Sequence, residues 1–105
     1  MKRGEVWWAE LPKPAGRRPV VLLSRDEAYQ VRELVTIAPL TTQIRNIPVE
    51  VRLGVPDGLP KECVVNADTI TTIPKSFLRD RIALLRAEKL KALDGAIKFA
   101  LALSS

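Results

Sequence analysis

The sequence predicts a mainly β protein with one C-terminal helix, in which the strands form a small, strongly bent antiparallel sheet or barrel. Short apolar runs at hairpin spacing, prolines between those runs, and a change to helical periodicity near the C-terminus support this prediction. The 105 residues fit one compact domain over residues 1–105. With 47% apolar residues, the chain can bury a core of its own.

Seven short segments are predicted strands. The first is aromatic and β-branched (EVWWAEL), the second and third are continuous apolar runs (PVVLLS, LVTIAPL), and the fourth alternates by twos (PVEVRL). The fifth and sixth (CVVN, TITTI) are rich in Val, Ile and Thr, and the seventh is short (RIALL). These segments are residues 5–11, 19–24, 34–40, 48–53, 63–66, 69–73 and 81–85. Their spacing favours antiparallel pairing between neighbours.

The last twenty residues change period and predict an amphipathic helix. Apolar residues recur there at spacings of three and four, with charged residues between them. Gly95 lies inside this pattern and costs about 1 kcal/mol relative to Ala. We therefore expect the helix to be docked on the sheet.

Charge and missing residue types narrow the function. Lys and Arg number 17 against 12 Asp and Glu, a net charge of +5, which favours anionic partners, with nucleic acid ahead of a membrane surface. The chain has no His and only one Cys, Cys63. A His general base, a Ser-His-Asp triad and a His/Cys zinc site are therefore excluded, and no cofactor or metal is expected.

The same features favour the cytoplasm. Cys63 has no partner for an internal disulfide, which is usual for proteins of the reducing cytosol. The residues after Met1 are charged rather than apolar, unlike a signal peptide. The apolar end at residues 100–103 is far shorter than the ~20 residues of a membrane span, so no membrane association is expected.

Two segments are candidate sites. The loop at residues 13–19 carries Arg17 and Arg18 on a stiff Pro/Gly base, and guanidinium groups bind phosphate through paired N–H donors. The end of the third strand carries Thr41, Thr42 and Gln43, followed by Arg45, and these side chains can hold a phosphate oxygen or read an unstacked base. A solvated basic loop and ordinary turn chemistry are the alternative interpretations.

Other polar and aromatic residues are assigned structural roles. Trp7 and Trp8 must face opposite sides of a strand, so we expect them in the core or a dimer interface, with base stacking as the alternative for one of them. Asp57, Glu62 and Asp68 lack metal-ligand spacing and are interpreted as solvated or structural.

Four motifs stand in one order over nearly the whole chain: GEVWW from Gly4, RPVVLLS from Arg18, PLTTQ from Pro39 and PVEV from Pro48. In this order and spacing they resemble the MazF/PemK family of toxin endoribonucleases. Residues 66–70 (NADTI) stand where the family has an acidic residue, Gln and Ile, and the Leu-rich C-terminal helix is also similar.

The resemblance implies a small SH3-like barrel of the PemK/CcdB type that forms a homodimer. It implies metal-independent cleavage of single-stranded RNA by attack of the ribose 2′-OH, leaving a 2′,3′-cyclic phosphate and a 5′-OH. It also implies inhibition by an acidic antitoxin of the MazE type, with operator DNA bound only through that antitoxin. Because the RNA supplies its own nucleophile, the absence of His and a metal site is compatible with this chemistry.

The family's catalytic Arg and Thr match Arg18 and Thr41 of this chain. The resemblance implies that Arg18 stabilises the pentavalent phosphorane, while the Thr41 hydroxyl donates a hydrogen bond to a phosphate oxygen. We expect Arg17, Thr42, Gln43 and Arg45 to bind RNA, with the arginines lining one groove.

The chain departs from the family at two places. The first loop lacks the Gly-Ser-Glu-Gln segment that many members have, and Thr69 replaces a frequent Gln. Both changes imply a different RNA selectivity, and the loss of the loop Glu leaves the general base unassigned.

Two rival functions remain open from the residues. One is a nucleic-acid-binding barrel without catalysis, such as a co-repressor, and the other is a gyrase-poisoning toxin of the same superfamily. Arg18 and Thr41 favour the ribonuclease, and a gyrase poison of this fold would not need that pair.

Overall fold

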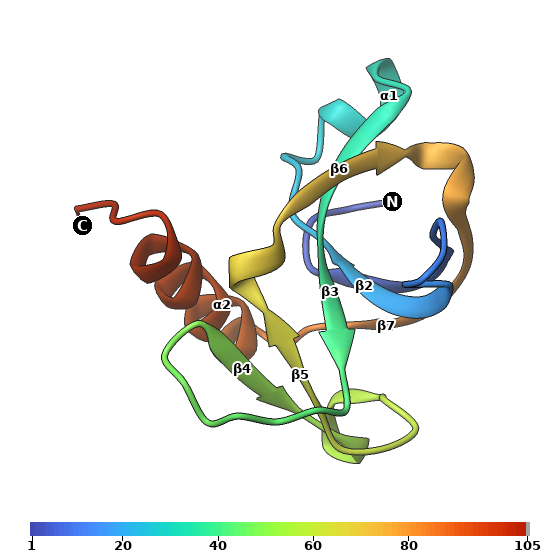
Figure 1. Cartoon of the computed structure of the whole chain (residues 1–105). Coiled ribbons are helices and arrows are strands. Elements are labelled where there is room, and N and C mark those ends of the chain that lie inside the picture. The colour runs from blue at the N-terminus through green and yellow to red at the C-terminus, as the bar shows by residue number, and fades with distance from the viewer. Residues whose placement is uncertain (105) are drawn as a thin grey trace.

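The computed structural model describes residues 1–104. Seven strands precede the long C-terminal helix, with a short helix and three 3-10 turns between them (Figure 1). The strands are β1 (Glu5–Glu10), β2 (Arg17–Leu22), β3 (Leu34–Thr41), β4 (Glu50–Leu53), β5 (Cys63–Asn66), β6 (Thr71–Pro74) and β7 (Leu78–Leu84). The helices are α1 (Ala28–Val31) and α2 (Ala87–Ala100), and the turns are η1 (Val55–Asp57), η2 (Ala67–Thr69) and η3 (Lys75–Phe77).

The strands form one curled antiparallel sheet in the order β4-β5-β3-β2-β1-β7, and β6 also pairs with β3. One edge of β3 pairs with β2, while its other edge pairs with β6 along the first half and with β5 at the end. This divided pairing bends the sheet around β3, so the chain from β6 to β7 passes in an arc around β2 (Figure 1), and β7 pairs with β1. The predicted bent antiparallel architecture with a C-terminal helix is confirmed.

The centre of the curled sheet, in β2 and β3, is buried on both faces. Val21 and Ala38 belong to a core that also contacts α2, whereas Val20, Leu22 and Ile37 belong to a second core inside the curl. Because successive residues of a strand point to opposite faces, a strand between two cores must be apolar at every position. This explains the continuous apolar runs in β2 and β3.

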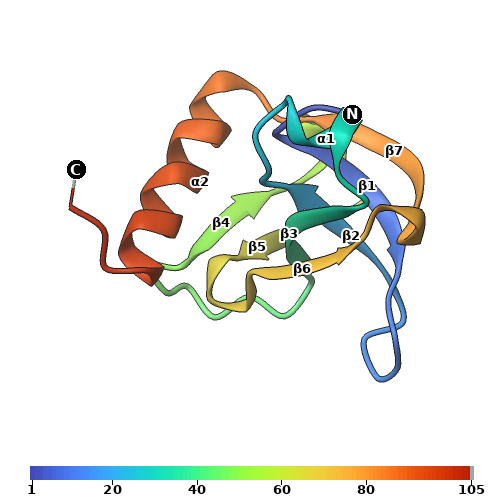
Figure 2. The same cartoon turned by 90° about the horizontal axis from the view of Figure 1, so that it is seen from above.

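Helix α2 covers the first core, standing beside β4 and apart from the curl of β6 and β7 (Figure 2). It buries Leu93, which belongs to its predicted amphipathic pattern, and Ala96, while Leu90 and Ile97 of that pattern are partly buried against the same core. A Cβ built on Gly95 would meet nothing within 4 Å, so this glycine serves no packing need. Gly4 differs: its φ is +91°, and a Cβ there would lie 2.6 Å from the Leu90 side chain. Close packing of the N-terminal turn on α2 therefore requires glycine at position 4.

Several element boundaries differ from the predictions. Helix α1 and the three 3-10 turns had no periodic signal, since each is only three or four residues long. Strand β7 begins at Leu78, before the predicted residue 81, because three consecutive exposed charged residues, 79–81, interrupt the apolar pattern at its start. Helix α2 ends at Ala100, and none of the helices within residues 1–104 is long and apolar enough to cross a membrane.

Candidate active site

Strand pairing brings Arg18 and Thr41 to the same level of the sheet. In the β2–β3 ladder Val20 lies opposite Pro39, and continuing that antiparallel register by two residues sets Arg18 opposite Thr41. A shift of two residues keeps side chains on one face of a strand. Arg18 and Thr41 therefore emerge on the face that holds Pro39, where the ladder ends.

These side chains line a polar cavity of about 220 Å³. Four of the predicted site residues meet there, together with two polar residues that sequence analysis did not assign to the site. The lining residues are Arg18, Pro39, Thr41, Gln43, Arg45, Asn66 and Thr69. Two of the seven are arginines and none is acidic, so the cavity offers an anion two guanidinium groups and several hydrogen-bonding side chains.

Arg18 carries a charge that its surroundings leave uncompensated. Its Nε atom is buried and has no hydrogen-bond acceptor, and no carboxylate of residues 1–104 forms an ion pair with it. A buried donor without an acceptor costs about 1–3 kcal/mol. Arg18 is thus an unsatisfied cation at the wall of a cavity, which is an arrangement that favours an anionic ligand.

Thr41 and Asn66 have defined local hydrogen bonds. The Thr41 Oγ1 accepts from the backbone N–H of Gln43 at 3.2 Å, which leaves its own proton available to a ligand. The Oδ1 of Asn66 accepts from the backbone N–H of Asp68 at 2.9 Å and caps η2. Its amide N–H groups remain as the donors that Asn66 can offer to the cavity.

Glu50 holds the loop that carries Arg45. Its carboxylate accepts from the backbone N–H groups of Arg45 and Asn46 at 2.9 Å each and from the Arg45 Nε at 3.3 Å. Burial alone raises the pKa of Glu50, whose side chain is 3% exposed, but these hydrogen bonds outweigh it, so the pKa lies below its ordinary value. Glu50 therefore fixes the loop, and it neutralises part of the Arg45 charge.

The structure does not bring Arg17 to this cavity. Its guanidinium lies over the Trp8 ring, 4.9 Å from the centroid, and near the carboxylates of Glu10 and Asp80, at 3.9 Å each. Since Arg17 and Arg18 are consecutive in β2, their side chains take opposite faces. The expectation that both line one groove is corrected for this reason.

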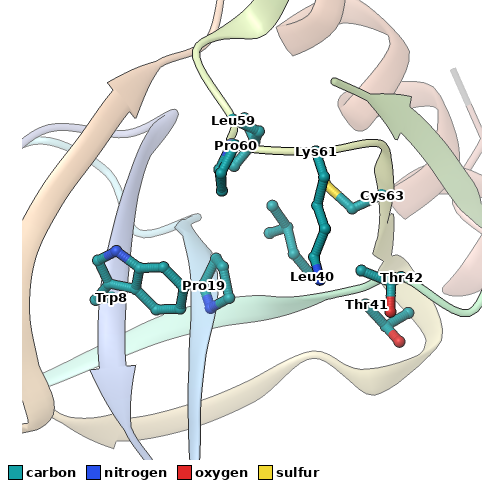
Figure 3. Close-up of a pocket in the computed structure, with 9 residues that line it drawn as sticks. All are labelled: Trp8, Pro19, Leu40, Thr41, Thr42, Leu59, Pro60, Lys61 and Cys63. Carbon is teal, nitrogen blue, oxygen red and sulfur yellow. The ribbon is translucent and has the colours of Figure 1, made fainter. Parts of the chain in front are cut away.

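Thr42 lines a separate, smaller cavity of about 80 Å³ that is mostly apolar (Figure 3). Trp8 and Pro19 form one of its sides, and Leu59 and Pro60 lie across from them (Figure 3). Thr41 stands at its rim with the hydroxyl turned away, consistent with its place in the polar cavity as well.

Both tryptophans are half-buried, so neither is the fully buried core residue that strand alternation allowed. Trp7 packs against the second core and donates its indole N–H to Glu5 Oε1 at 3.0 Å. Burial raises the pKa of Glu5, but this hydrogen bond, other hydrogen bonds and nearby positive charge lower the pKa below its ordinary value.

The three acids without metal-ligand spacing have structural roles, as expected. Asp57 and Glu62 form ion pairs with arginines, and the backbone N–H of Asp68 donates to the residue that caps η2.

Asn66 and Thr69 are the site residues that sequence analysis did not assign. Pairing of Thr41 with Val64 carries the end of β5 alongside β3, and η2 then turns both residues into the cavity. The sequence did point to position 69, because Thr69 stands where the family frequently has Gln, whose side chain carries an amide. The structure shows that Asn66 supplies an amide in the same cavity.

No metal site is evident near the cavity. Within residues 1–104, no three His, Cys, Asp or Glu side chains are grouped so that they could hold a metal ion. Cys63 is buried, and burial, followed by nearby Asp57 and Glu62, raises the pKa of its thiol, which disfavours the reactive thiolate.

The chain matches a known protein family over nearly its whole length. Residues 2–101 match the family described as PemK-like, MazF-like toxin of type II toxin-antitoxin system. The chain is similar to "Probable endoribonuclease MazF5" of Mycobacterium tuberculosis, with 38% identity over 99 residues, 93% of this chain and 90% of that protein. It is also similar to "Endoribonuclease MazF9" of the same organism, with 32% identity over 100% of this chain and 99% of that protein.

Solved structures agree with these sequence matches. The fold superposes on "Mycobacterium tuberculosis toxin MazF-mt6" with a TM-score of 0.89 and 34% identity, covering 96% of this chain and 99% of that chain. It superposes equally on an "Endoribonuclease in complex with its cognate antitoxin from Mycobacterial species", with a TM-score of 0.89, 30% identity, and coverage of 100% and 98%.

Proposed function

Because the chain belongs to the PemK-like, MazF-like toxin family, we propose that the polar cavity around Arg18 is the phosphate site of its ribonuclease activity. The protein is an RNA-cleaving toxin that an antitoxin neutralises. The observation that carries the proposed site is the uncompensated Arg18, whose buried Nε lacks an acceptor beside Thr41. A phosphodiester supplies the missing negative charge and acceptor oxygens.

The cavity's chemistry suits a reaction in which single-stranded RNA attacks itself. The ribose 2′-oxygen forms a bond to phosphorus while the bond from phosphorus to the 5′-oxygen breaks. The 2′-OH loses a proton and the leaving oxygen gains one, so the products are a 2′,3′-cyclic phosphate and a 5′-OH. Arg18 stabilises the charge that develops on the phosphorane, and the Thr41 hydroxyl donates to a phosphate oxygen.

Binding contacts extend along the polar cavity. Gln43 and Asn66 offer amide groups to the nucleotides beside the phosphate, and Arg45 adds charge from the loop held by Glu50. Arg17 and Thr42 lie on the other side of β2 and β3, so we propose no contact between them and the scissile phosphate.

None of the lining residues is an ordinary general base. Arg, Thr, Asn, Gln and Pro side chains do not titrate between pH 5 and 9. The cavity therefore acts by stabilising charge rather than by removing the 2′-OH proton, and we expect a cleavage rate without a bell-shaped pH dependence over that range.

The decisive test is cleavage of a mixed single-stranded RNA by the purified protein in EDTA, followed by sequencing and chemical typing of the new ends. We expect cyclic phosphate and 5′-OH ends at a rate that EDTA leaves unchanged. Cleavage that EDTA abolishes and Mg²⁺ restores would contradict the proposed chemistry. RNA or DNA bound without cleavage would support the co-repressor alternative, and trapped gyrase–DNA complexes would support the gyrase poison.

Antitoxin binding should compete with RNA. An extended acidic segment is attracted by the +5 net charge and the free Arg18, so we propose that it covers the same cavity. RNA and antitoxin should then exclude one another, with antitoxin association slowed by salt. A stable ternary complex with uncut RNA would contradict this competition.

We propose that operator DNA is bound through the antitoxin. The proposed location is the cytoplasm, where RNA is abundant.

We also propose a homodimer. The C-terminal end of α2 and the residues after it expose Phe99, Leu101 and Leu103, at 62%, 54% and 55% of their surface. Three large apolar side chains exposed at one end of the molecule favour an interface. Sedimentation should show a dimer at micromolar concentration, and Phe99→Asp should shift it to a monomer.

A further inference from the structure

A second, larger cavity adjoins the polar one. It has a volume of about 450 Å³ and shares Arg18, Pro39 and Thr69 with the polar cavity. It opens at the end of the second core, between the first loop and β6, and its lining is mostly apolar. The two cavities are therefore neighbouring parts of one groove, with the Arg18 guanidinium where they meet.

Phe77 forms the aromatic wall of the larger cavity. Its ring packs against the second core, and it lies at the end of η3, just before Leu78 enters β7. This turn is tied down by Lys75, whose backbone N–H donates to the Glu33 carbonyl at 2.7 Å and whose Nζ donates to the Tyr29 carbonyl at 2.6 Å. The ring is thus held in place before any ligand binds.

The remaining lining supplies flat apolar surface and a few hydroxyls. Pro12, Pro39 and Pro74 contribute rigid rings, while Thr69 and Thr71 are exposed residues whose hydroxyls can exchange water for a ligand atom. The third threonine of the lining, Thr72, has its hydroxyl 3.3 Å from that of Thr36. Arg18 is the only charged residue in the lining.

This chemistry matches a nucleoside better than another phosphate. A nucleobase has two apolar faces that stack on aromatic rings and a polar edge that hydroxyls can read, and in RNA it is covalently tied to an anionic phosphate. A cavity with one aromatic wall and few polar groups, directly beside a phosphate-binding guanidinium, fits that pairing. Its volume lies within the range of small-molecule sites.

We propose that the larger cavity is the subsite for one nucleobase adjacent to the cleaved phosphate, with Phe77 stacking on the base and Thr69 and Thr71 reading its edge. The inference rests on the proposed function, which places the phosphate at Arg18. It assigns base selectivity to β6 and η3 as well as to the first loop, which is short in this chain.

The experiment cleaves a random-sequence single-stranded RNA pool in EDTA and compares cut-site sequences and kcat/KM between the wild-type protein, three variants and one control variant. Phe77→Leu keeps apolar bulk but removes the flat ring. It should lower kcat/KM on the preferred sequence about tenfold or more, mainly through KM, and weaken the preference at one position beside the cut. Phe77→Trp should retain that preference, and Thr71→Val should change which base is preferred there.

Val31→Ala is the control, since Val31 is 78% exposed on α1 and lines neither cavity. Circular dichroism and thermal unfolding establish that each variant is folded. If folded Phe77→Leu keeps the wild-type rate and preference, the inference is overturned while the proposed function stands. A uniform loss of rate with an unchanged base preference overturns it too, as does weakened antitoxin binding alone. A wild-type protein that does not cleave the pool would overturn the proposed function itself.

Discussion

Replacing Arg18 by Met should make the protein more stable and nearly inactive. Met keeps an unbranched apolar stem for packing but removes the guanidinium. The Arg18 Nε is buried without an acceptor, and removing such a donor relieves about 1–3 kcal/mol. We expect the free energy of unfolding to rise by about 1 kcal/mol, since solvent near the cavity satisfies the rest of the group. For a domain of this size that corresponds to roughly 4–8 °C in Tm.

The same substitution should lower activity for a separate reason, although it raises stability. Removing one preorganised group that stabilises developing charge typically lowers kcat by about 10²–10³-fold, or roughly 3–4 kcal/mol of transition-state stabilisation. Arg18 is the only charged residue common to both parts of the groove, so no neighbour replaces it. Gain of stability with loss of function is the pattern expected of a strained functional group.

Arg17→Met is the matched control, one residue away in the same strand. Its ion pairs to Glu10 and Asp80 are long, at 3.9 Å, and all three side chains are more than half exposed. Such pairs contribute less than about 1 kcal/mol, and the contact with Trp8 adds a similar amount. Arg17→Met should therefore lower stability by about 1 kcal/mol and change the cleavage rate by no more than a few fold.

Urea unfolding tests the expected gain in stability, and single-turnover cleavage in EDTA, measured on the same preparations, tests the expected loss of activity. The expected gain in stability is refuted if Arg18→Met is less stable than the wild type, and the expected catalytic role is refuted if the folded variant remains active. That role is also refuted if Arg17→Met loses as much cleavage as Arg18→Met, since the two side chains would then serve one site.

Three further outcomes are expected. Gly95→Ala should raise the free energy of unfolding by up to about 1 kcal/mol in urea titrations, because a Cβ there meets nothing within 4 Å; a loss of stability would show a hidden contact. Glu50→Gln should weaken RNA binding through Arg45. It should also lack the stability that the lowered pKa of Glu50 contributes, so the variant should be less stable than the wild type above the ordinary carboxyl pKa, and this difference should shrink as pH falls through the lowered pKa. Burial raises the pKa of Tyr29, the only tyrosine, from 10.0 to about 12, so ultraviolet titration should show one late phenol transition. Stability should fall between those pH values by up to about 3 kcal/mol, and Tyr29→Phe should lack this contribution.

The sequence was sufficient to predict those features that depend on neighbouring residues. Continuous apolar runs predicted β2 and β3, and the three-to-four spacing predicted α2, because burial on a strand or helix imposes these periods directly. Short motifs were enough to select Arg18 and Thr41, since the residue types and their order carry the family resemblance. The exclusion of histidine chemistry needed only the composition.

Tertiary structure decided which of these residues share a site. Arg17 and Arg18 are adjacent in the chain, yet the two faces of β2 meet different surroundings, and only one of these holds the polar cavity. Asn66 and Phe77 reach the groove because β3 pairs with β5 at its end and with β6 along its first half. Pairings between residues more than twenty positions apart depend on how the whole sheet bends around two cores. The periodicity of neighbouring residues does not determine that bend, so only the folded chain shows which side chains the bend brings together.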